Sequence, residues 1–70
     1  MRMVKLTLRA ARVNKGLTMA EAAKRLGVTT KTLWFWEHGE RLPNQKYIPA
    51  ICALYGVSYD LINFLPDNPV

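Results

Sequence analysis

The sequence predicts an all-α domain of five short helices. Apolar residues recur at spacings of three and four, which is the period of an amphipathic helix. Threonine or serine precedes three of these segments, where its hydroxyl can cap a helix. Glycine, which favours the left-handed conformation at a helix end, follows the first four segments, at Gly16, Gly27, Gly39 and Gly56. We therefore expect one domain over residues 1–70, with its core at about 7–65.

The first two helices are predicted at about Thr7 to Lys15 and between Thr18 and Gly27. Thr18 and Glu21 have the spacing of a capping box, in which each side chain accepts the other residue's backbone N–H. The paired alanines of the second helix suggest that another helix crosses it closely. The buried faces are expected to consist of Leu8, Ala11, Arg12, Ala22, Ala23 and Leu26.

The last three helices are predicted at about Thr30–His38, Tyr47–Tyr55 and Tyr59–Phe64. Thr29 and Ser58 would cap the first and last of them, and Pro49 suits a first helical turn because it has no N–H. Pro66 prevents the fifth helix from continuing, and Arg2–Lys5 could form a short extended segment. Their core residues are expected to be Val28, Leu33, Trp36, Ile48, Ile51, Cys52, Leu54, Val57, Leu61, Ile62 and Leu65.

Composition excludes several classes of protein. Half of the residues are hydrophobic, which is ordinary for a folded domain. No apolar run approaches the roughly 20 residues of a membrane span, and the start lacks the apolar region of a signal peptide. One cysteine, Cys52, permits no internal disulfide, and with the single His38 it cannot supply the usual three or four metal ligands. We expect a cytoplasmic protein with no cofactor, metal or membrane partner.

The positive charge is concentrated in one part of the chain. Ten Lys and Arg oppose five Asp and Glu, for a net charge of +5. All ten basic residues lie within Arg2–Lys46, which carries +7, whereas Tyr47–Val70 carries −2. The excess alone fits a generic soluble basic protein equally well. Its uneven distribution favours a polyanionic partner for the first two-thirds of the chain.

The central segment has the layout of a helix-turn-helix. Two short helices are separated by a tight turn at Gly27, and the second opens with the short polar side chains of Thr30, Lys31 and Thr32. In a helix-turn-helix, the first helix crosses the DNA backbone and the N-terminal residues of the second enter the major groove.

A set of short motifs extends this pattern along the chain. They are Leu8-Arg9-x-x-Arg12, Gly16-Leu17-Thr18-x-x-Glu21, Leu26-Gly27-Val28-Thr29, Trp36-Glu37-x-Gly39, Arg41-x-Pro43 and Gly56-Val57-Ser58. Their order and spacing, from about Leu8 to Leu65, resemble the Cro/C1-type (XRE) helix-turn-helix family. The resemblance implies a compact five-helix, lambda-repressor-like fold. It also implies a small, repressor-like transcription regulator that binds specific sequences of double-stranded DNA.

The resemblance also implies roles for individual residues. Arg12 and Glu37 would form a partly buried salt bridge between the first helix and the end of the third. The base-reading positions are Thr30, Lys31, Thr32 and, one turn on, Phe35. The phosphate-contact positions are Thr18, Met19, Lys24, Thr29, Arg41 and Lys46. Capping or simple solvation would explain Thr18, Lys24, Arg41 and Lys46 equally well, but it ranks below DNA contact for Thr29–Thr32. Thr29 is expected both to cap its helix and to lie near phosphate.

Three departures from the family pattern affect the predicted interface. Met19 stands where a phosphate-binding glutamine is usual, and Thr30 stands where glutamine or serine often opens the helix. Trp34 and Phe35 occupy positions that are normally polar. Phe35 could contact thymine methyls, Trp34 could be an additional core residue, or the two could form an exposed patch that binds protein.

Other functions and assemblies remain open at this stage. A homodimer on a pseudo-palindromic site could use Tyr55, Tyr59 and Phe64. The alternative function is a protein-interaction module, or an excisionase-like or antitoxin-like accessory protein, that uses Trp34 and Phe35. An excisionase or MerR-like fold ranks lower because a helical pattern, rather than a β-wing, follows the third helix. We expect no enzyme, because no acid–base pair is evident, and no small-molecule ligand.

Overall fold

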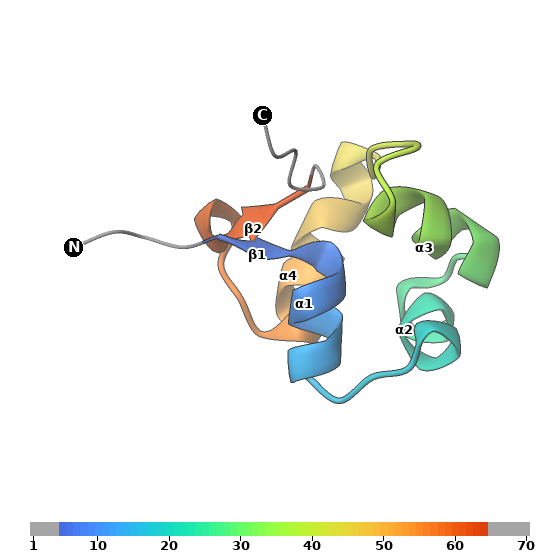
Figure 1. Cartoon of the computed structure of the whole chain (residues 1–70), viewed down its shortest axis with the longest axis horizontal. Helices are drawn as coiled ribbons and strands as arrows, with labels where there is room; N and C mark the ends of the chain where they lie inside the picture. Colours follow the sequence, from blue (N-terminus) through green and yellow to red (C-terminus); the bar gives the residue numbers. More distant parts are fainter. Residues whose placement is uncertain (1–4, 65–70) are drawn as a thin grey trace.

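The computed structural model describes residues 5–64, which form four α-helices joined by short connections (Figure 1). The helices are α1 (Leu8–Asn14), α2 (Met19–Leu26), α3 (Thr30–Glu37) and α4 (Ile48–Tyr55). Two 3-10 turns, Gln45–Tyr47 and Tyr59–Leu61, and two short strands, β1 (Leu6–Thr7) and β2 (Ile62–Asn63), complete the described part. None of these helices is long and apolar enough to cross a membrane.

Threonine hydroxyls define where the first three helices begin. Thr7, Thr18 and Thr29 each accept the backbone N–H three residues on, at 3.0, 3.1 and 3.1 Å. Glu21 completes the predicted capping box, because its Oε1 accepts the Thr18 N–H at 2.9 Å. These bonds use N–H groups that would otherwise lack a partner in the first turn. At the other end, Gly27 closes α2 with a φ of +76°.

The predicted fifth helix is not confirmed. Tyr59–Leu61 makes a single 3-10 turn, and β2 then pairs in parallel with β1, Leu6 opposite Ile62 and Thr7 opposite Asn63. The Ser58 side chain makes no capping bond in the described residues, so the predicted N-cap that would favour a helix here is missing. The extended backbone instead buries Ile62 to 3% exposure and gives both strands backbone partners.

The remaining differences are small. The fourth helix begins at Ile48, after a separate 3-10 turn in which Asn44 Oδ1 accepts the Lys46 N–H at 3.1 Å. A short extended segment is found at Leu6–Thr7, while most of the one expected at Arg2–Lys5 lies outside the described residues. The expectations for Arg2, Leu65 and Pro66 lie outside the described residues.

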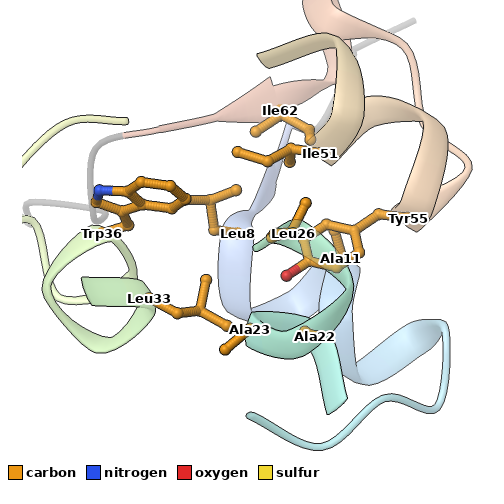
Figure 2. Close-up of a cluster of buried hydrophobic side chains, with 10 residues drawn as sticks. All are labelled: Leu8, Ala11, Ala22, Ala23, Leu26, Leu33, Trp36, Ile51, Tyr55 and Ile62. Atoms are coloured by element: carbon orange, nitrogen blue, oxygen red, sulfur yellow. The ribbon is translucent and has the colours of Figure 1, made fainter. Parts of the chain in front are cut away.

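One core joins all four helices to β2. Figure 2 shows these side chains converging from the separate elements. The hydrophobic members are Leu8, Ala11, Ala22, Ala23, Leu26, Leu33, Trp36, Ile51, Tyr55 and Ile62. The predicted residues Val28, Cys52, Leu54 and Val57 pack half-buried around them. Tyr55, which sequence reasoning assigned to a surface, belongs to this core at 4% exposure.

Candidate nucleic-acid interface

The predicted helix-turn-helix is formed by α2, the turn at Gly27 and α3, which lie next to each other in Figure 1. The left-handed Gly27 lets the chain reverse, and the Val28 N–H donates to the Ala23 carbonyl at 3.0 Å. Ala22 and Ala23, at 0% and 2% exposure, bring only methyl groups to the core. Because small side chains permit close approach, α3 can lie tightly against α2 with its opposite face outward.

An ion pair fixes the end of α3 to α1. The Arg12 Nε donates to Glu37 Oε2 at 2.7 Å and its Nη2 donates to Glu37 Oε1 at 3.2 Å. The remaining Nη1 donates to the Leu17 carbonyl at 2.9 Å, which ties in the loop before α2. The hydrogen bond to Glu37 raises the pKa of Arg12, against the opposing effect of burial. The bidentate geometry therefore orients three segments around one guanidinium.

The charges of this ion pair act on a buried hydroxyl, that of Tyr55. The Tyr55 Oη is buried and has no hydrogen-bond partner within residues 5–64. Burial, with a smaller contribution from the Glu37 charge, raises the pKa of Tyr55 to about 12. Tyr55 therefore stays neutral in the folded protein, and its place in the core removes it from the candidate dimer surface.

The four predicted base-reading residues differ in their surroundings. Thr30 and Lys31 are exposed on the first turn of α3, whereas Thr32 and Phe35 are half-buried. The Thr32 Oγ1 accepts a hydrogen bond from the Thr29 hydroxyl at 3.0 Å. The Thr29 oxygen thus caps α3 by accepting the Thr32 N–H, and Thr32 keeps its own hydroxyl hydrogen as a donor.

Besides Thr29 at the start of α3, the predicted phosphate-contact residues lie in three parts of the fold. Thr18 caps α2 and Lys24 lies in its last turn, and both are exposed. Met19 is half-buried and packs against the core, so it offers apolar surface where the family pattern has a polar side chain.

The other two predicted phosphate contacts follow α3. Arg41 lies in the loop after α3, with its Cζ 5.6 Å from the centroid of the Phe35 ring. Lys46 lies in the next 3-10 turn, with its Nζ 5.2 Å from the centroid of the Tyr47 ring. Both cations are exposed.

The outward face of α3 carries an aromatic cluster that sequence reasoning described only in part. Trp34 is 40% exposed and stacks on His38, with ring centroids 3.7 Å apart and planes at 16°. Phe35 meets Trp34 edge to face at 5.7 Å. His38 had no predicted role, although its position four residues after Trp34 places both on one helix face. Trp34 is thus partly solvent-exposed and lies outside the hydrophobic core cluster.

The two remaining dimer candidates lie near the C-terminal end of the described part. Tyr59 is 64% exposed, and its ring centroid lies 5.8 Å from that of Phe64. They border a shallow apolar hollow whose other lining residues include Leu42, Pro43 and Ile48. Within residues 5–64, no three His, Cys, Asp or Glu side chains gather where they could hold a metal ion.

Comparison with known proteins bears directly on this arrangement. A family model described as Helix-turn-helix matches residues 8–62, which include all four α-helices and the Arg12–Glu37 ion pair. No curated protein and no solved structure matches the chain. The family match covers most of the sequence, with its two central helices placed as a helix-turn-helix requires. The chain therefore belongs to the Cro/C1-type (XRE) helix-turn-helix family of DNA-binding transcription regulators.

Proposed function

We propose that this protein recognises a specific sequence of double-stranded DNA by placing the first turn of α3 in the major groove. The observation that carries the proposal is the exposed pair Thr30 and Lys31 at the start of a helix whose inner face is anchored. The N-terminal residues of a recognition helix are those that reach base edges. A lysine at this place can donate to guanine O6 and N7, and a threonine can bond to a base or contact a thymine methyl.

The exposed cations supply the sequence-independent part of binding. Within residues 5–64, the only side-chain ion pair is Arg12–Glu37, so Lys24, Arg41 and Lys46 have no carboxylate within 4 Å. These three, with Thr18 and Thr29 at the starts of α2 and α3, are the proposed phosphate contacts. Phosphate contacts position a protein on the duplex, while base contacts select the sequence.

We further propose that the protein acts as a repressor-like homodimer on a pseudo-palindromic site. Its half-sites would lie about one helical turn apart, as for other helix-turn-helix dimers. The exposed Tyr59 and the neighbouring Phe64 form the proposed contact, and the apolar hollow beside them offers surface to a second copy. Tyr55 is excluded from this surface because it is buried.

The test is selection of the purified protein against a random duplex library, followed by titration of the enriched duplex over a range of salt concentrations. An enriched palindrome with a steep salt slope would support a dimeric sequence reader. Lys31→Ala should then relax preference at one base position at a cost of about 1–3 kcal/mol. Lys15→Ala is the matched control, because Lys15 lies at the end of α1 beside Gly56 and outside the helix-turn-helix.

The exposure of Trp34 favours a second candidate, a protein-interaction module in which Trp34 and Phe35 bind a partner. Aromatic residues dominate the energetics of many protein interfaces. Phe35 is only half-buried, so the two aromatic residues are neither both in the core nor both fully exposed. Absence of any enriched sequence, with only weak salt-sensitive DNA binding, would favour this candidate and an excisionase-like or antitoxin-like accessory role.

A further inference from the structure

The Phe35 ring is the meeting point of two cations from different segments. The Lys31 Nζ lies 5.8 Å from the ring centroid and the Arg41 Cζ lies 5.6 Å from it. Both distances fall within the roughly 6 Å over which an aromatic face attracts a cation. Lys31 comes from the first turn of α3, whereas Arg41 follows the helix, so the ring connects a proposed base contact with a proposed phosphate contact.

The backbone holds Arg41 in this position. The N–H groups of Glu40 and Arg41 both donate to the Phe35 carbonyl, at 2.9 and 3.3 Å. The chain reverses at Gly39, whose φ of +75° lies in the left-handed region. The loop therefore returns onto the residue whose ring lies beneath the guanidinium, and the contact does not depend on a long side chain alone.

Aromatic contacts also hold the Phe35 ring itself. Phe35 is half-buried and packs edge to face on Trp34, which in turn stacks on His38. Lys31 and Arg41 lie over the face of the Phe35 ring. Lys31 and Arg41 have no carboxylate within 4 Å in the described part of the chain. The ring is thus placed to organise two charges that remain available to DNA.

We propose that Phe35 is a positioning residue, which holds Lys31 and Arg41 as one pre-organised cationic unit and does not read a base itself. This inference rests on the proposed function. Holding a flexible side chain in its bound conformation reduces the entropy lost on binding, and affinity rises without any new contact. It differs from direct contact between Phe35 and thymine methyls, and the two can be separated experimentally.

The experiment is a set of double-mutant cycles on the duplex enriched by selection. Phe35→Leu keeps an apolar side chain and removes the aromatic face, and we expect it to weaken binding about tenfold, which corresponds to about 1.4 kcal/mol. Its effect should be strongly non-additive with Lys31→Ala and with Arg41→Ala, because each pair shares one contact. It should be additive with Lys46→Ala, since Lys46 lies over Tyr47 instead. Phe35→Tyr, which keeps the ring, should retain both affinity and coupling.

Two further measurements separate the possible outcomes. In the free protein, the NMR signals of the Lys31 ε-methylene and the Arg41 δ-methylene should carry ring-current shifts that Phe35→Leu removes. Replacement of thymine by uracil should affect wild type and Phe35→Leu equally. The inference would be wrong, and the proposed function would stand, if the losses from Phe35→Leu were additive with those from Lys31→Ala and Arg41→Ala. The same holds if replacing thymine by uracil weakened binding only in wild type. Failure of the wild-type protein to select any duplex would overturn the proposed function and this inference with it.

Discussion

Loss of Arg12 should strongly destabilise the fold. Arg12→Met would leave the Glu37 carboxylate, with a side chain 1% exposed, without its partner. Breaking one side of such a pair costs about 3–5 kcal/mol, because the remaining charge stays buried. We expect a corresponding fall in the free energy of unfolding, measured by urea denaturation. The double variant, Arg12→Met with Glu37→Met, should recover most of the lost free energy of unfolding. A double variant less stable than Arg12→Met would contradict this account.

Substitution of Tyr55 should stabilise the protein, in contrast to Arg12, because the Tyr55 hydroxyl is buried without a described partner. Tyr55→Phe removes that unsatisfied group and should raise the free energy of unfolding by about 1 kcal/mol at neutral pH. A loss of 1 kcal/mol or more would show that the hydroxyl makes a stabilising contact.

The raised pKa of Tyr55 also predicts alkaline destabilisation. The folded value is about 12 against an ordinary value of 10.0, so the unfolded chain ionises first. Stability from this group is complete below pH 10 and is lost as pH rises towards 12, by about 2–3 kcal/mol. Urea denaturation between pH 9 and 12 should show this loss in wild type and not in Tyr55→Phe. Equal losses in both proteins would assign the effect to other groups.

At the level of elements, the capping box links the start of α2 to acid stability. Thr18→Ala should lower the free energy of unfolding by about 1 kcal/mol, because an N–H of the first turn loses its acceptor. The hydrogen bond from the Thr18 backbone lowers the pKa of Glu21. Stability from Glu21 is therefore present above its unfolded pKa and is lost as pH falls through its folded pKa.

Denaturation at pH 6 and pH 3 measures this effect. Glu21→Gln should lose less stability than wild type over that interval, because it has no carboxylate to protonate. Glu40→Gln is the matched control, since Glu40 is exposed and has no side-chain ion pair or capping bond within residues 5–64. Acid sensitivity of Glu21→Gln equal to that of wild type would contradict the assignment.

The sequence predicts an element accurately when the residues that determine it lie next to it in the chain. The bounds of α1 to α4 fall within about a residue of those expected, because caps and left-handed glycines lie beside the ends that they define. The segment after Ser58 was predicted as helix and forms a turn and β2, because its partner β1 lies at the other end of the chain. Helical periodicity within Tyr59–Phe64 contains no information about that partner.

For the whole molecule, the same distinction applies to the candidate interface. The resemblance correctly located the helix-turn-helix, and the structure forms the ion pair that it implied. It did not reveal that Tyr55 is buried, or that Trp34 stacks on His38. The burial of Tyr55 depends on the packing of α4 against α2, whereas the contact between Trp34 and His38 follows from their four-residue spacing and was overlooked in the sequence.

Charge is the property of the whole molecule that most directly predicts its binding behaviour. A phosphate contact releases counterions, so each lost contact should shallow the slope of log K against log salt by roughly one. Lys46→Ala should therefore weaken binding to all duplexes alike and reduce the slope by that amount. Lys46 is exposed in the 3-10 turn before α4 and has no carboxylate within 4 Å in the described residues. Lys15→Ala removes the same charge at the end of α1 and should leave the slope nearly unchanged. Equal reductions in both variants would mean that the total charge attracts DNA without a defined binding face, and an unchanged slope in Lys46→Ala would remove Lys46 from the proposed phosphate contacts.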